Sequence, residues 1–164
     1  MSTDLSGIDG VTYPWDDYPA PGTVREVADG ILWLSTPVPF VGLRQVNLWL
    51  LADGDGWTMI DCGYGWDETR GLLETIWKQA LGGLPVKRLI VTHYHPDHAG
   101  NMAWISERWG GLLPVMTLGE WFAANISMNF GYADNIKQRG VWHRAHGLDD
   151  SRQKLFETDV VPYD

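Results

Sequence analysis

The sequence has little cysteine and little positive charge. Its 164 residues include one cysteine, Cys62, which excludes an internal disulfide and a structural zinc cluster built from cysteines. The 12 Lys and Arg residues stand against 21 Asp and Glu residues, so the formal net charge is −9. Binding to nucleic acid or to an anionic membrane depends on a basic surface. We therefore expect neither class of partner.

Long hydrophobic runs are also missing from the sequence. No apolar stretch reaches the roughly 20 residues that a helix needs to cross a bilayer. Residues 1–7 carry neither the basic start nor the apolar run of a secretory signal. Together with the low cysteine content, these features predict a soluble protein of the cytoplasm, which is a reducing compartment.

The chain does have enough length and apolar content for one folded domain. Hydrophobic residues make up 45% of it and charged residues 20%, which excludes a disordered chain. Prolines interrupt residues 1–22, where we predict an irregular arm that lies on its own domain rather than on a substrate or a second subunit. The remaining residues, 23–164, are predicted to form the folded part.

Strand signals come first along the chain, and helical signals follow. Apolar runs and turn pairs predict a first group of strands at 24–27, 31–34, 46–51 and 57–61. Helical spacing begins at Asp67, the predicted N-cap, and Gly82-Gly83 ends that helix. The later elements are predicted as a buried strand at 89–92, a strand at 113–117 and helices at 98–109, 118–137 and 149–157. This order predicts a mixed α/β fold.

Side chains that can bind a metal are concentrated after the predicted buried strand, in the run from His93 to His98. Three of the five histidines lie within these six residues. Imidazole is the commonest metal ligand, and carboxylate is a compatible one. His93 and His95 stand two apart, so on an extended segment both rings reach one ion. Asp97 and His98 begin the next helix and face a second ion. These four donors suit zinc, with iron or manganese as alternatives.

Two motifs in this order resemble the metallo-β-lactamase-fold hydrolases. Residues 46–63, which end in Asp61-Cys62-Gly63, resemble the opening strands and the Asp-x-Gly element of that family, and residues 88–101 resemble its metal motif. The resemblance implies an αββα sandwich, of which this chain supplies mainly the N-terminal αβ half. It also implies that His93 and His95 bind the first metal and that Asp97 and His98 bind the second.

The resemblance assigns other roles in the same segment. Asp61 is implied to brace the metal loop through hydrogen bonds without being a ligand. Cys62 is expected to be a small buried residue rather than a nucleophile. The implied function is that of a zinc-dependent hydrolase with one or two ions, whose metal-bound hydroxide attacks a thioester, lactone or similar ester of a small-molecule substrate. Asp97 then serves as a ligand and as the acceptor of the water's proton.

Three other functions stay open at this point. The first is a ribonuclease or other phosphodiesterase of the same fold, and the second is a mononuclear iron oxygenase that uses His93 and His95. The third is a non-catalytic, incomplete chain that binds a partner and holds no metal. Metal retention separates the third from the enzymes, metal identity separates the oxygenase, and a salt-dependent affinity for RNA favours the ribonuclease.

The later ligands of the family have no clear match in this chain. The family takes a third histidine, a bridging aspartate and a further histidine from downstream, where this chain has only His143 and His146. We expect these two residues on a solvated helix end or loop. The simplest account is an N-terminal part of a longer hydrolase. Its open sheet face would favour a homodimer or low solubility unless a C-terminal half covers it.

Several aromatic and apolar residues near the motif also carry expectations. Trp104 and Trp109 are predicted to pack in the core, and Tyr94 to point away from the ligands. Trp121 and Phe122 are candidates to shape an active-site cleft. Residues 37–43 either pack within the hairpin or support an acyl chain of the substrate.

Overall fold

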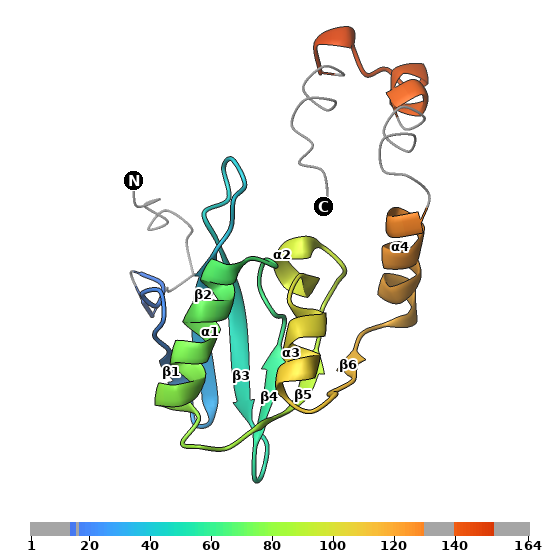
Figure 1. Ribbon diagram of the computed structural model, residues 1–164. Helices are drawn as coiled ribbons and strands as arrows, with labels where there is room; N and C mark the ends of the chain where they lie inside the picture. The colour runs from blue at the N-terminus through green and yellow to red at the C-terminus, as the bar shows by residue number, and fades with distance from the viewer. Residues whose placement is uncertain (1–13, 16, 130–139, 153–164) are drawn as a thin grey trace.

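The computed structural model describes residues 14–15, 17–129 and 140–152 of the chain. It has a six-stranded sheet, with helices on one face (Figure 1). The strands stand side by side in chain order. This is the mixed α/β arrangement that the sequence predicts. It consists of one sheet and one layer of helices. No helix in the described ranges is both long enough and apolar enough to cross a membrane.

The first four strands form an antiparallel meander. They are β1 Arg25–Ala28, β2 Ile31–Pro37, β3 Gln45–Ala52 and β4 Trp57–Ile60. The predicted turns at Asp29-Gly30 and at residues 53–56 lie between them, as expected. Two parallel strands, β5 Val86–Ile90 and β6 Pro114–Val115, complete the sheet. Each is reached through helical segments, because parallel neighbours require a crossover connection.

The prediction of a fully buried strand over residues 89–92 is wrong in its bounds and in its burial. β5 begins at Val86 and ends at Ile90, and Lys87, Arg88 and Ile90 are exposed. The reason is that the described helices cover one face of the sheet. Leu89 points into that covered side and is completely buried, whereas Ile90 points to the open side and is 36% exposed. A strand covered on one face buries only the side chains that point to that face, so it does not read as a continuous apolar run.

The first long helix, α1 Asp67–Ala80, begins one residue earlier than predicted, because Asp67 was expected to be its N-cap. Trp66, with extended backbone, is the N-cap, and Asp67 lies in the first turn together with Glu68. Acidic side chains are favourable there because they face the positive end of the helix dipole. Gly82 and Gly83 follow with φ angles of 60° and 80°, so the predicted glycine stop is confirmed.

The helix predicted over residues 98–109 is in fact two helices. They are α2 Pro96–Ala99 and α3 Met102–Arg108. The His98 carbonyl accepts hydrogen bonds from the Cys62 backbone N–H at 2.8 Å and from the Cys62 thiol at 3.0 Å. That carbonyl is therefore bound by the loop after β4 and does not accept a hydrogen bond within a continuing helix. The helix is interrupted at Gly100-Asn101.

The core fills the space between the sheet and the helices α1 and α3. Leucine and methionine side chains from the inner face of the sheet meet apolar side chains of both helices. The members that are at most 1% exposed include Leu34, Leu48, Leu50, Met59, Leu73, Ile76, Leu89 and Ile105. Trp77 stacks on Trp104 at 5.3 Å and contacts Trp109 edge-on at 5.3 Å. The prediction that Trp104 and Trp109 are core contacts is confirmed.

The last labelled helix, α4 Leu118–Asn129, follows β6. The prediction extended it to residue 137, and residues 130–139 lie outside the described ranges. Residues 140–145 are helical, and a further helical turn begins at residue 150. Of the helix predicted over 149–157, the part from 153 onward also lies outside the described residues. The division into an arm at 1–22 and a domain at 23–164 stays a prediction.

Candidate metal centre

His93 and His95 lie on the loop that leaves the carboxyl end of β5. The base of this loop is tied to β6, because the Val91 N–H donates to the Val115 carbonyl at 2.8 Å. The ring centroids of His93 and His95 are 4.7 Å apart, and the ring of His98 lies 4.0 Å from that of His93. The structure thus brings three imidazoles together at the edge where α/β sheets bind ligands.

The short helix α2 carries Asp97 and His98 into this cluster. Pro96 opens the helix, and Asp97 is 7% exposed in its first turn. The Nε2 atom of His98 lies 3.5 Å from Oδ2 of Asp97. A buried carboxylate therefore faces one of the three imidazoles. Both are donor types that zinc accepts.

Asp61 lies beneath the cluster, in a conformation that few residues adopt. Its φ is 59°, in the left-handed region where non-glycine residues are strained, and it is 4% exposed. Its carboxylate accepts hydrogen bonds from the Thr92 N–H at 2.7 Å and from Nδ1 of His98 at 2.8 Å. Burial opposes ionisation of this carboxyl, but the hydrogen bonds from His98 and Thr92 outweigh burial and lower its pKa.

A chain of hydrogen bonds from Asp61 fixes the orientation of two histidines. The Thr92 hydroxyl lies 2.8 Å from the carboxylate, so it donates to Asp61, and it lies 3.0 Å from Nδ1 of His93. A proton on Nδ1 of His93 is then donated to Thr92, and a proton on Nδ1 of His98 is donated to Asp61. Both rings keep the lone pair on Nε2, the atom that is left to bind a metal.

The protonation of these histidines follows from their neighbours. Burial lowers the pKa of His93, and the nearby His98 and His95 lower it further. The hydrogen bond to Asp61 raises the pKa of His98, against the effect of burial. A neutral imidazole is the form that binds a metal. At neutral pH His93 is therefore ready to bind, whereas His98 more easily carries a proton that a metal would displace.

Cys62 follows Asp61 and is completely buried. Burial raises the pKa of its thiol to about 12. Since the thiolate is the nucleophilic form, this cysteine is inert in the folded chain. The expectation of a small buried residue agrees with this environment.

Asn101 is a residue of this site to which the sequence analysis gave no role. It is completely buried, and its amide donates hydrogen bonds to the carbonyls of Cys62 at 3.0 Å and Tyr64 at 2.8 Å. Its Oδ1 accepts from Nε of Arg70 at 3.1 Å. It therefore joins the loop after β4 to the break between α2 and α3. A polar residue at the end of the motif was the available signal, but its partners lie far away in sequence.

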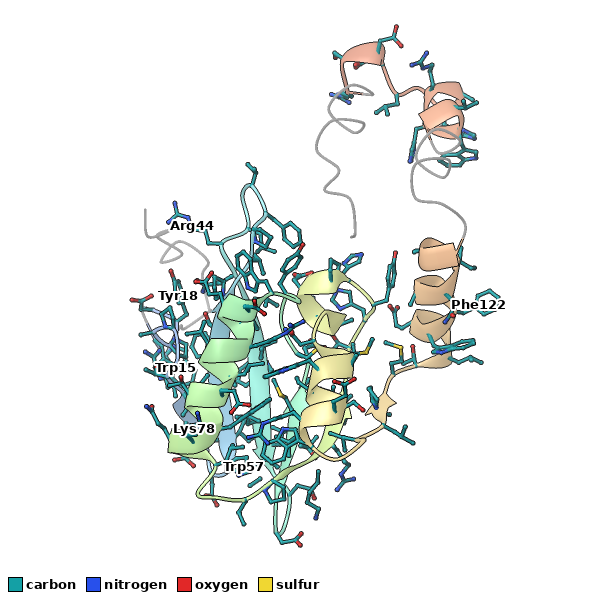
Figure 2. The ribbon with its side chains drawn as sticks, viewed as in Figure 1. Trp15, Tyr18, Arg44, Trp57, Lys78 and Phe122 are labelled. Atoms are coloured by element: carbon teal, nitrogen blue, oxygen red, sulfur yellow. The ribbon has the colours of Figure 1, made fainter. Side chains whose placement is uncertain are left out.

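Tyr94 and Glu120 form a second contact that the sequence analysis missed. The backbone N–H of Tyr94, between His93 and His95, donates to Oε2 of Glu120 in α4 at 3.0 Å. The prediction that Tyr94 points away from the ligands is wrong, because its ring lies 5.0 Å from that of His95 on this irregular loop. Phe122, a candidate for shaping the cleft, is 58% exposed and lies on the side of α4 away from the sheet (Figure 2).

The cluster fits zinc by donor type. Three imidazoles and the carboxylate of Asp97 are all ligands that zinc takes in proteins. Within the part of the chain that the structure describes, however, no three His, Cys, Asp or Glu side chains already form a set that could hold a metal ion. To complete a coordination shell, these imidazole rings must therefore shift toward a common point, or further ligands must join them.

His143 and His146 do not join the cluster in this structure. Residues 140–152 lie well away from α2 and the sheet (Figure 1). The ring of His146 stacks on Trp142 at 4.0 Å, and its Nδ1 lies 2.7 Å from the Trp142 carbonyl. This placement agrees with the expectation of a helix end or loop for both residues.

Comparison with known proteins extends the sequence resemblance. The sequence profile of the metallo-β-lactamase superfamily matches residues 41–118, which hold both motifs. A crystal structure of a β-lactamase domain protein from Burkholderia ambifaria is similar, with 41% identity and a TM-score of 0.66. The match covers 76% of this chain and 39% of that one.

A metallo-β-lactamase from Pontibacter korlensis shows the same fold at lower similarity. It has 22% identity and a TM-score of 0.54, over 65% of this chain and 47% of that one. The present chain thus spans less than half the length of either structure. The comparisons agree with the expectation of one αβ half of the αββα sandwich.

Proposed function

Residues 41–118 match the metallo-β-lactamase superfamily, and from this premise we propose that the chain binds zinc and acts as a hydrolase of a thioester, lactone or similar ester. The observation that carries the proposal is the gathering of His93, His95, His98 and the buried Asp97 at the carboxyl end of β5. The match to this superfamily supports a metal-dependent enzyme. The zinc and the ester substrate are the parts that need a test.

In this proposal His93 and His95 hold the first ion, and Asp97 and His98 hold the second when two are present. Zinc, when bound, lowers the pKa of a water molecule to about 7 and so supplies a nucleophile at neutral pH. When these rings are neutral, Thr92 and Asp61 favour the proton on Nδ1 of His93 and His98, which leaves the lone pair on Nε2 for a metal. The Asp97 carboxylate would accept the proton of that water molecule at Oδ2.

The apolar loop between β2 and β3 is well placed to contact a substrate. It lies at the same end of the sheet as α2 (Figure 1). Val38 is buried, and Phe40 packs edge-on against Tyr64 at 5.5 Å, so both contribute to hairpin packing. Val41 and Leu43 are exposed. We propose that these two side chains contact the apolar part of the substrate.

The metal content of the purified chain after dialysis tests the proposal first. We expect one or two zinc ions per chain, and loss of this zinc in the His93→Ala/His95→Ala double variant. The variant His143→Ala serves as the matched control and should retain zinc. If the wild-type chain retains iron, the oxygenase takes the place of the hydrolase. If it retains no metal, the non-catalytic chain that binds a partner is favoured.

A panel of thioesters, lactones and phosphodiesters tests the reaction itself. We expect zinc-dependent turnover of at least one ester class, and its loss in Asp97→Asn. Turnover confined to RNA, with an affinity that falls steeply as salt rises, would replace the ester hydrolase with the ribonuclease.

A further inference from the structure

The parallel pairing of β5 and β6 brings two later segments to one edge of the sheet. The carboxyl ends of neighbouring parallel strands lie at the same edge. The loop with His93 and His95 leaves β5 there, and α4 begins a few residues after β6. Glu120, in the first turn of α4, consequently comes within reach of Tyr94 although the two are far apart in sequence.

The contact between the metal loop and α4 is a hydrogen bond from a backbone N–H to a side-chain carboxylate. Oε2 of Glu120 accepts the Tyr94 N–H at 3.0 Å, and the Glu120 N–H is itself held by the Thr117 hydroxyl at 3.3 Å. A hydrogen bond to an ionised carboxylate is stronger than one between neutral groups. Both Tyr94 and Glu120 are half-buried, so water competes only in part for this bond.

We infer that Glu120 is a positioning residue for the metal loop: by holding the Tyr94 N–H, it sets the separation and direction of the flanking His93 and His95 side chains. This inference rests on the proposed metal site. Glu120 lies just outside the segment that matches the superfamily profile, which ends at residue 118. The role is therefore argued from this structure and not from the family motif.

The rest of α4 adds weight to this role. Its large apolar side chains are mostly open to solvent, with Leu118 at 78%, Trp121 at 52% and Phe122 at 58% exposure. These side chains bury little surface against the sheet. The polar tie from Glu120 to Tyr94 therefore matters more for holding α4 against the loop than it would in a well-packed helix. A displacement of α4 would therefore move the Tyr94 backbone, which lies between His93 and His95.

The test compares three variants of the full 164-residue chain. Glu120→Ala removes the acceptor, and Glu120→Gln keeps an amide oxygen at the same place without the charge. Glu107→Ala removes the same charge from an exposed position on α3 and is the control. Far-UV circular dichroism first establishes that each variant is folded. Zinc affinity is then measured by competition with a chromophoric chelator.

We expect Glu120→Ala to weaken zinc binding by roughly 10- to 100-fold, the usual effect of losing a group that orients ligands. Glu120→Gln should retain most of the affinity, and Glu107→Ala should leave it unchanged. Equal losses in Glu120→Gln and Glu120→Ala would mean that the carboxylate acts through its charge alone, which would overturn the positioning role. No loss in Glu120→Ala would overturn it as well.

A readout on the metal-free chain separates this inference from the proposed function. In Glu120→Ala we expect the Tyr94 amide and the His93 and His95 ring signals to shift in NMR spectra, with smaller shifts in Glu120→Gln. If the wild-type chain binds no zinc, the proposed function fails while these shifts still report on the loop. Unchanged ring signals would overturn the positioning role whether or not zinc binds.

Discussion

At the scale of single residues, Asp61 links the chemistry of the site to the backbone. Its left-handed φ of 59° is a conformation that costs free energy in a residue with a side chain, and it persists where surrounding contacts determine it. Here those contacts are the hydrogen bonds to Thr92 and His98. In this conformation the Asp61 carboxylate bonds to His98 directly and to His93 through the Thr92 hydroxyl, so it orients both imidazoles.

The neighbouring Cys62 provides a prediction at this scale. Because burial raises its thiol pKa to about 12, almost no thiolate is present at pH 8. We expect the native chain to resist alkylation by iodoacetamide at pH 8 and to react with one equivalent after unfolding in urea. The reaction is followed by mass spectrometry.

A control for this measurement moves the thiol to the surface. The double variant Cys62→Ser/Gln79→Cys places a cysteine on the exposed side of α1, where it should react rapidly in the native state. Prompt stoichiometric labelling of native wild-type Cys62 would contradict the burial and the raised pKa described above.

The site residues divide clearly into those that sequence could and could not predict. His93, His95, Asp97 and His98 are close together in sequence, so their donor chemistry is visible as a motif. Asn101 and Glu120 act through partners that lie far away in the chain, such as the carbonyl of Cys62 and the N–H of Tyr94. Spacing contains no information about such pairs. Their roles emerge only when the fold brings the segments together.

At the scale of elements, the break between α2 and α3 shapes the site. Gly100 at this break faces Gly65, in the loop after β4. A Cβ on Gly65 would lie 2.6 Å from the Gly100 carbonyl oxygen, and a Cβ on Gly100 would overlap the Pro96 carbonyl and the Gly65 nitrogen. Two backbones thus approach at a distance that only glycine permits. The approach lets the Cys62 N–H reach the His98 carbonyl.

The variant Gly100→Ala tests this close approach. The added methyl group must push the two backbones apart, so we expect the free energy of unfolding to fall by about 1–3 kcal/mol. The measurement is urea denaturation of the metal-free chain followed by circular dichroism. The change should also weaken zinc binding, because α2 carries Asp97 and His98.

Gly71→Ala is the matched control for this substitution. Gly71 lies within α1, where an added Cβ would meet nothing within 4 Å. Replacing glycine inside a helix removes an entropic cost, so we expect a gain of about 0.5–1 kcal/mol. A Gly100→Ala variant as stable as this control would refute the steric argument.

The elements themselves were predictable where local rules decide them. The hairpin at Asp29-Gly30 and the glycine stop after α1 depend on backbone conformations that neighbouring residues determine. The bounds of β5 and the interruption at Gly100-Asn101 depend on other segments: the open side of the sheet in the first case, and the Cys62–His98 contact in the second. The error over residues 98–109 arose because helical spacing continues through a break imposed by tertiary contact.

At the scale of the whole molecule, the outer face of the sheet carries a continuous apolar row. The register pairs Trp33 with Trp49, Trp49 with Ile60, Ile60 with Ile90, and Ile90 with Val115. The row therefore crosses five strands. The rings of Trp33 and Trp49 stack at 6.1 Å and are half-buried, whereas Ile90 and Val115 are 36% and 54% exposed. Such a contiguous row favours association.

We expect the 164-residue chain to associate with a second copy through this face. A face that contacts its own copy can form a closed two-fold dimer, which buries the exposed Ile90 and Val115 side chains. Sedimentation velocity over a range of protein concentrations should show a monomer–dimer equilibrium. The variant Ile90→Lys/Val115→Lys places charges at the exposed end of the row and should shift the equilibrium toward monomer.

The matched control places the same two charges elsewhere. Val41→Lys/Leu43→Lys alters exposed apolar residues of the loop between β2 and β3, away from the row, and should leave the dimer intact. A dimer that dissociates equally in both variants would reflect total charge instead of this face. A wild-type chain that stays monomeric at every concentration would show that the row is tolerated in water, because its tryptophans already cover one another. The sheet would then need no second layer to remain folded.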